Sequence, residues 1–146
     1  MSKQKSPDTA LLNYVAKNCQ MGKSSIKQLL PVVENENFRR SIESQYREYD
    51  EIDDLAVKAL ARHGTHPEDV GAMAKISSYL MINTGAIIDN STSHMAEMMC
   101  KGSSNGIIEI TKRLSEHHEA NEETRDLANR LLAAEEHNIE ELKRYL

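Results

Sequence analysis

The amino-acid sequence predicts an all-α protein, and three observations carry that prediction. Apolar residues recur at alternating spacings of three and four over long stretches, which is the period of an amphipathic helix. Aromatic residues make up only 4% of the chain, which suits a helical bundle better than a β-sandwich. The six glycines and three prolines fall mostly at the boundaries of the periodic stretches. With 146 residues and no internal repeat or linker, we expect residues 1–146 to form a single helical-bundle domain.

The composition excludes several classes of protein. The formal net charge is −5, so the chain has no general electrostatic attraction for nucleic acid. No apolar run approaches the length needed to cross a bilayer, and the opening residues MSKQKSPD lack the apolar region of a signal peptide. Two cysteines are too few for a disulfide scaffold. We therefore expect a cytoplasmic protein with no nucleic-acid partner and no membrane partner.

The first helix is expected over residues 7–33. Ser6 is suited to cap its N-terminus, and Pro7 occupies a first-turn position where its missing N–H has no cost. Pro31 lies near the other end and is expected to bend the last turn. The residues that share the helical period predict the inner face: Leu12, Val15, Cys19, Gly22, Ile26, Leu29 and Val33.

The second helix is expected over 36–63 and the third over 66–88. Gly64 is suited to end the second helix, because glycine accepts the left-handed conformation at helix C-termini. Thr65 and Glu68, three residues apart, form a capping box that would open the third. The predicted inner face of the second helix is Phe38, Ile42, Gln45, Tyr49, Ile52, Ala56, Leu60 and His63.

The last two helices are expected over 93–118 and 121–145. The first of them contains Gly102 and Gly106, four residues apart, which form a ridge of small residues that lets another helix approach closely. Short turns make sequential helices antiparallel, so the second and fourth should run in the same direction with the third as a long return. The sequence predicts an antiparallel four-helix bundle with an additional long crossover helix, five helices in all.

Two segments carry a resemblance to a known family: SQYREYDEIDDLA at 44–56 and AAEEHNIEELKRYL at 133–146. Through them, and through helix order and length over nearly the whole chain, the protein resembles the ferritin-like superfamily. In particular it resembles small rubrerythrin-like bundles of anaerobic Firmicutes. The resemblance implies a di-iron site at mid-bundle, with one glutamate from each of two helices and a Glu-x-x-His motif from each of the other two.

The chain departs from that ligand set at most positions. The last-helix motif falls on Glu135 and Asn138, so an amide stands where the family has an imidazole. The lone glutamates of the family correspond to Gly22 and Gly102. Only Glu135 remains a well-placed carboxylate, whereas an iron pair needs several anionic oxygens. We therefore expect the di-metal centre to be degenerate.

The second-helix motif falls on Gln45 to Glu48, with Gln45 central and Glu48 at the edge of the inner stripe. Gln45 and Tyr49 are expected at the height of Glu135 and Asn138, so these four side chains should form a polar cluster inside the bundle. One interpretation is a hydrogen-bond network that fixes the register of the helices, with the glycines bringing two of them together. The other is a pocket for a small polar ligand or a single metal ion.

A second group of residues could bind a soft metal. His94, Met95, Met98, Met99 and Cys100 follow one another on the fourth helix, and Cys19 lies on the first. Thioether, thiol and imidazole groups suit Cu(I), although methionines at helical spacing are also ordinary core residues.

The expected function is that of a non-catalytic ferritin-like bundle, whose role lies in structure, in binding or in homo-oligomer formation. One alternative is a carrier of a metal or a small polar ligand. The other is a metal-dependent oxidase or peroxidase with nonstandard ligands. No cofactor is predicted; any that is bound should be a metal ion (Fe, Cu or Zn), with Glu135 and Glu48 as further candidate ligands.

Overall fold

The computed structural model describes residues 6–67 and 91–146, and the described residues are helical with short connections. The α-helices are α1 (Pro7–Leu29), α2 (Glu36–Arg62), α4 (Thr92–Glu116) and α5 (Glu122–Lys143), with a 3₁₀ turn, η1 (Leu30–Val32), after α1. The all-α prediction is thus confirmed for this part of the chain, in which no strand occurs. Beyond residues 66 and 67, which are not helical, the third helix expected over 66–88 lies outside the described residues.

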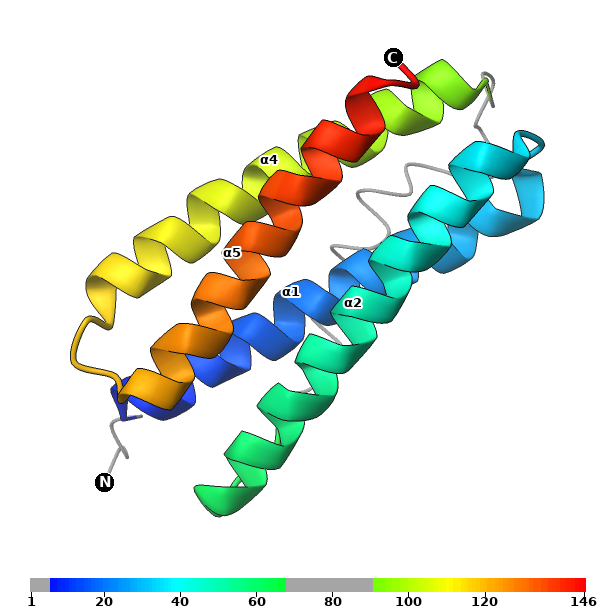
Figure 1. Cartoon of the computed structure of the whole chain (residues 1–146). Helices are drawn as coiled ribbons and strands as arrows, with labels where there is room; N and C mark the ends of the chain where they lie inside the picture. Colours follow the sequence, from blue (N-terminus) through cyan, green and yellow to red (C-terminus); the bar gives the residue numbers. More distant parts are fainter. Residues whose placement is uncertain (1–5, 68–90) are drawn as a thin grey trace.

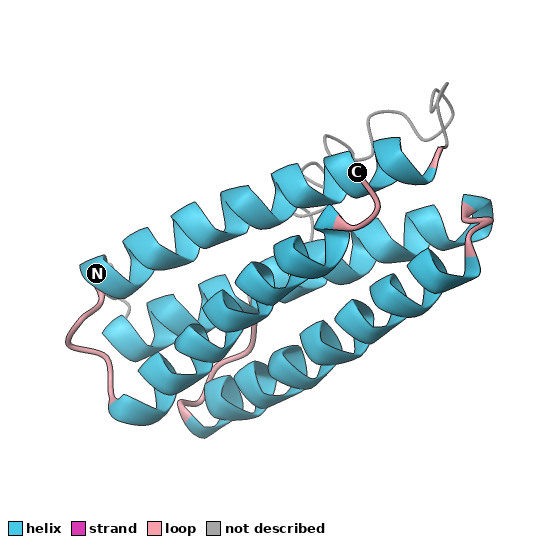
Figure 2. Cartoon of the chain, turned by 45° about the horizontal axis from the view of Figure 1, so that its top comes forward, coloured by secondary structure: helices cyan, strands magenta, loops and turns pink. Residues whose placement is uncertain are grey.

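The four α-helices lie as two antiparallel pairs (Figure 1). α1 pairs with α2 and α4 pairs with α5, and α5 also packs against α2 and α1. α2 and α4 run in the same direction, as the sequence predicts, because α4 begins at the end of the bundle where α2 begins (Figure 1). Figure 2 shows the helices running along one common direction, with the turns that join α1 to α2 and α4 to α5 at the ends of the bundle.

Each helix begins at a residue whose side chain caps it. Ser6 accepts a hydrogen bond from the backbone N–H of Thr9 at 3.1 Å, and Asn35 accepts one from Phe38 at 3.0 Å. Ser91 and Asn121 do the same for α4 and α5. Such caps satisfy N–H groups that have no partner within the helix and contribute about 1 kcal/mol each. The helix starts are therefore fixed by local sequence.

The helix ends follow the breaking residues. Pro31 cannot donate a backbone hydrogen bond, and α1 gives way there to the 3₁₀ turn at Leu30–Val32 instead of continuing to 33. Gly64 has φ +75°, the left-handed conformation predicted for it. With it, the N–H of Thr65 bonds back to the carbonyl of Leu60 at 3.0 Å and closes α2. The remaining bounds lie within two residues of those expected.

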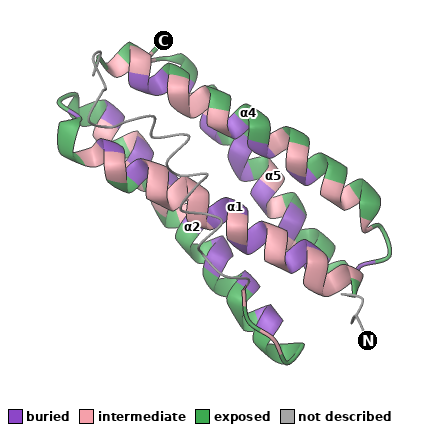
Figure 3. Cartoon of the chain, turned by 180° about the vertical axis from the view of Figure 1, so that it is seen from behind, coloured by how far each residue is buried: buried purple, intermediate pink, exposed green. Residues whose placement is uncertain are grey.

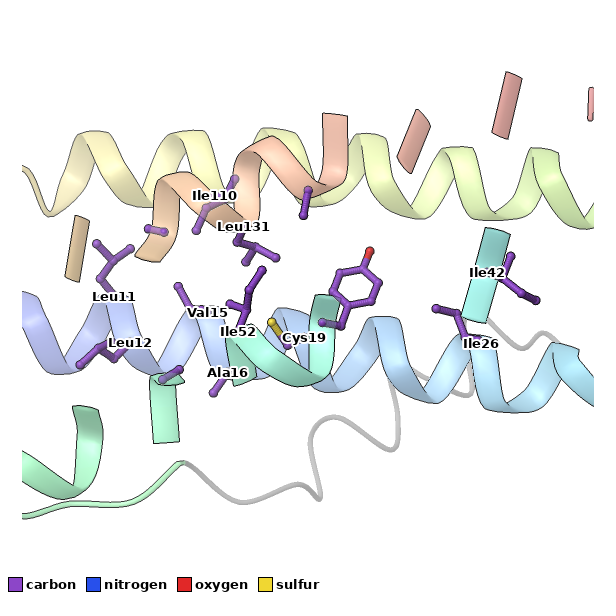
Figure 4. Packing of buried hydrophobic residues seen from close by; sticks show 14 of the residues in the cluster. Leu11, Leu12, Val15, Ala16, Cys19, Ile26, Ile42, Ile52, Ile110 and Leu131 are labelled. Carbon is purple, nitrogen blue, oxygen red and sulfur yellow. The ribbon is translucent and has the colours of Figure 1, made fainter. Parts of the chain in front are cut away.

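The buried faces of all four helices turn toward one another (Figure 3). Leu11, Val15, Ile52, Ile110 and Leu131 are fully buried and come from α1, α2, α4 and α5, where they meet at one level of the bundle (Figure 4). Burying a side chain of this size stabilises the fold by roughly 1.5–3 kcal/mol. Among the described helices, none is both long enough and apolar enough to cross a membrane.

Charged groups also join the helices. Asp53 on α2 is 5% exposed and accepts hydrogen bonds from Gln20 and, at 2.9 Å, from Lys23 on α1. Arg130 on α5 holds Glu48 on α2 by two hydrogen bonds of 2.9 and 3.0 Å. These pairs fix the registers of α1 against α2 and of α5 against α2.

Candidate functional site

Glu135 lies at the centre of a buried polar cluster. α5 places its side chain in the interior, where the residue is 3% exposed. The carboxyl oxygen Oε1 accepts a hydrogen bond from the hydroxyl of Tyr49 on α2 and one of 3.2 Å from the hydroxyl of Ser103 on α4. One carboxyl oxygen on α5 is thus hydrogen-bonded to residues of both α2 and α4.

Asn138 completes this cluster from one turn further along α5. Its amide Nδ2 donates to the Tyr49 hydroxyl oxygen at 3.1 Å and to Glu135 Oε1 at 3.5 Å. Asn138 is 3% exposed and Tyr49 is 5% exposed, so water does not compete for these bonds. We use the name carboxyl cluster for Tyr49, Ser103, Glu135 and Asn138.

The carboxyl cluster has no positive charge in it. Burial raises the pKa of Glu135 to about 7, although the hydrogen bonds from Tyr49, Ser103 and Asn138 favour the ionised form. Burial, together with the charge of Glu135, raises the pKa of Tyr49 well above its usual range. None of the ion pairs between described residues includes Glu135. Near neutral pH the carboxyl can therefore gain a proton or a cation at little cost.

Two glycines make room for the carboxyl cluster. A Cβ atom at Gly22 on α1 would lie 2.5 Å from Cε2 and 2.6 Å from Cζ of the Tyr49 ring. A Cβ atom at Gly106 on α4 would collide with Oε2 of Glu135 and lie 3.1 Å from Nδ2 of Asn18. These two positions bring backbone directly against the side chains of the cluster.

Gly102 has a different part in the structure. A Cβ atom there would meet no atom of the described residues within 4 Å, and the residue lines a cavity between α1 and α4 of about 260 Å³. Glu135 and Tyr49 form its inner end, and its walls include Met21, Met98 and Met99. The glycine on α4 at the height of Glu135 is Gly106, one turn beyond Gly102. The helix backbone at Gly22 is therefore packed closely against Tyr49, whereas Gly102 borders the cavity.

Gln45 is expected in the polar cluster, but it forms no hydrogen bond with the residues of the carboxyl cluster. It is 4% exposed, and neither atom of its amide has a hydrogen-bond partner among the described residues. It lies in a groove between α2 and α5 whose lining also contains Asn138. Glu48, expected as a metal ligand, is held by Arg130, which lowers the pKa of Glu48. These two residues do not extend the ligand set of Glu135.

The soft-metal candidates lie in different places. Met95 and Cys19 are fully buried in the core, whereas Met98 and Met99 line the cavity. Cys100 lines another depression, beside Leu146. His94 stands next to the capped start of α4, where its backbone N–H bonds to Ser91. In residues 6–67 and 91–146, no three His, Cys, Asp or Glu side chains come together as a possible metal site.

Sequence reasoning missed Ser103 and Asn18. Ser103 continues the spacing of Met99, Gly106 and Ile110, so the helical period alone could have placed it on the inner face of α4. Asn18 is 7% exposed and its amide donates to the Tyr14 hydroxyl at 3.4 Å. It lies beside the predicted stripe of α1, and nothing in the local pattern distinguishes it from a surface residue.

Comparison of the chain with protein-family models, with curated proteins and with solved structures gave no match. The function is therefore argued from the carboxyl cluster and the cavity alone.

Proposed function

We propose that this protein binds a small organic molecule in the cavity between α1 and α4, and that it does so on a ferritin-like bundle whose metal centre has been replaced by the carboxyl cluster. The observation that carries the proposal is the position of Glu135. A buried carboxyl that has no ion-pair partner among the described residues forms the inner end of a cavity of about 260 Å³. A cavity with mostly apolar walls and a few convergent polar groups is the usual form of a small-molecule site.

The topology of the helices and the position of the carboxyl cluster support a ferritin-like bundle. α2 and α4 run parallel and α1 pairs with α2 as α4 pairs with α5 (Figure 1). The carboxyl cluster takes residues from α2, α4 and α5 in the middle of the bundle, where the superfamily would place its metal ligands. One carboxyl among amides and hydroxyls favours a non-catalytic role over iron chemistry.

A purely structural network would need no cavity beside it. Tyr49, Ser103 and Asn138 already satisfy Oε1 of Glu135, and a larger residue at position 102 would fill the space next to them. Glycine in a helix interior costs about 1 kcal/mol relative to alanine. Gly102 therefore lowers stability without relieving a contact with any other described residue, which is understandable if the open space is used for binding.

Filling the cavity should abolish binding without unfolding the protein. In Gly102→Leu the new side chain would extend into the space between α1 and α4, since a Cβ atom there meets no described atom within 4 Å. We expect the wild-type protein to bind the probe benzyl alcohol saturably, and the variant to lose at least ten-fold in affinity, as measured by NMR titration. The matched control is Ser104→Leu, on the exposed side of the same helix.

If none of the probes benzyl alcohol, benzylamine and benzoate binds the wild-type protein, or if the probe that binds does so equally well in Gly102→Leu, the cavity is not a ligand site and the proposed function is wrong. Circular dichroism of each variant checks that the helices are retained.

A further inference from the structure

We infer that the molecule bound in the cavity carries an ammonium group, which pairs with Glu135, on a short apolar body. This inference rests on the proposed function and adds the chemical class of the ligand. It follows from the charges on the cavity wall, from the hydrogen-bonding groups at its inner end and from the character of its other walls.

The charged residues on the cavity wall are all acidic. Glu135 on α5 forms the inner end of the cavity, and Glu109 on α4 also lines it. No lysine, arginine or histidine is among the described lining residues. The guanidinium of Arg113 lies 5.2 Å from the centre of the ring of Tyr14, which lines the cavity, but Arg113 is not itself among the described lining residues. Lys112 lies 3.7 Å from Glu109 but is itself largely exposed. A ligand carboxylate or phosphate would therefore be buried against like charge, which is costly.

An ammonium group would find the complement it needs. Ionised Glu135 supplies a charge with no cationic partner among the described residues, and charge-assisted hydrogen bonds are about twice as strong as neutral ones. Asn18, Asn105 and Ser25 also line the cavity, and each has a side-chain oxygen. The Ser25 hydroxyl is buried and has no hydrogen-bond partner among the described residues. It can accept a hydrogen bond from a second polar group of the ligand.

The rest of the wall suits an apolar body. Met21, Met98, Met99 and Leu29 line the cavity together with the ring of Tyr14. Thioethers adapt to irregular shapes and make favourable contacts with aromatic rings, so a phenyl group or a short alkyl chain fits this lining. The backbone at Gly102 keeps the space between these side chains open.

The pairing makes binding depend on pH. Among the described residues, the titratable groups that interact with Glu135 include Tyr14 and Cys19 on α1 and Tyr49 on α2, and none of these three carries a positive charge. Ammonium binding requires ionised Glu135, whose pKa is raised to about 7 by burial. The affinity for an ammonium ligand should thus be highest above pH 7. Below pH 7 it should decrease, by up to ten-fold for each pH unit. A neutral ligand would show no such fall.

The test compares three probes of similar shape (benzylamine, benzyl alcohol and benzoate) by NMR titration at pH 8. We expect benzylamine to bind at least ten-fold more tightly than benzyl alcohol, and benzoate to bind most weakly. In Glu135→Gln the preference for the amine should fall below three-fold. In Glu136→Gln, which changes an exposed neighbour, the preference should persist.

The possible results separate the inference from the proposed function. Equal binding of benzylamine and benzyl alcohol, or an amine preference that survives in Glu135→Gln, overturns the inference and leaves the cavity as a ligand site. Failure of all three probes overturns the proposed function and the inference together. An amine preference that Glu135→Gln removes supports both.

Discussion

Replacing Gly22 by alanine should destabilise the protein by about 2 kcal/mol, although alanine is the better helix former. The added methyl group would lie 2.5, 2.6 and 2.8 Å from three carbon atoms of the Tyr49 ring. The ring cannot turn aside freely, because its hydroxyl is bound to Glu135 and to Asn138. The collision must therefore displace α1 or break the carboxyl cluster. Urea denaturation followed by circular dichroism measures the loss.

Gly102→Ala is the matched control for this change. It makes the same substitution in the middle of another helix, where, in the part of the chain that the structure describes, no atom lies within 4 Å of the new methyl group. Because alanine has a higher helix propensity than glycine and no described atom has to move, we expect Gly102→Ala to stabilise the protein by about 0.5–1 kcal/mol. The opposite signs of the two effects would locate the close contact at Gly22. Equal effects in both variants would mean that Tyr49 does not pack against the α1 backbone.

Replacing Glu135 by glutamine should change how stability depends on pH. A glutamate whose pKa is raised from 4.5 to about 7 binds more protons in the folded state than in the unfolded state between these values. Its contribution to the free energy of unfolding therefore falls as pH rises from about 4.5 to 7, by about 3 kcal/mol. The glutamine variant lacks this loss. We expect it to resemble the wild type near pH 4.5 and to be more stable by up to about 3 kcal/mol at pH 8.

The measurement is the difference in unfolding free energy between variant and wild type at a series of pH values, which cancels the titration of all other groups. Glu136→Gln alters the neighbouring, exposed carboxyl and serves as the control. Its difference from the wild type should stay small and should not change sign with pH. A constant difference for Glu135→Gln across the same range would show that Glu135 is ionised throughout.

Much of the helical architecture is predictable because its signals are local. Ser6 and Gly64 act within one turn of chain, and each sets the helix end that its chemistry predicts. Pro31 is expected only to bend the last turn, but α1 ends before it and not at residue 33. The inner stripe of α2 follows from periodicity up to Leu60, whereas His63, predicted on the same stripe, is exposed at the helix end. The parallel course of α2 and α4 is also as the sequence predicts.

The carboxyl cluster is only partly predictable, because its composition depends on how four helices are set against one another. Periodicity places Tyr49, Glu135 and Asn138 on inner faces, and the structure joins them by hydrogen bonds. It places Gln45 there equally well, yet that amide lies on the groove side of α2 without a partner among the described residues. A stripe of residues defines a face of a helix, and the crossing of the helices decides which neighbour each residue meets.

The glycines show the same limit. From the sequence, Gly22 and Gly102 could each bring helices together or leave a space between them. The two outcomes differ by whether a side chain of another helix comes forward to meet the backbone. Tyr49 does so at Gly22, and Glu135 does so at Gly106. No side chain of residues 6–67 or 91–146 does so at Gly102, and the cavity lies there.

Whether the cavity ends on an unpaired carboxyl is tested most directly by a ¹³C NMR titration of the Glu135 side chain in protein labelled at glutamate, with Glu135→Gln to assign the signal. We expect a pKa near 7 for this carboxyl, and we expect that pKa to fall when benzylamine is added. A signal that remains that of an ionised carboxylate down to the ordinary pKa of glutamate would contradict this expectation. Glu135 would then already have a cationic partner, such as a metal ion, and the cavity would not end on an unpaired carboxyl.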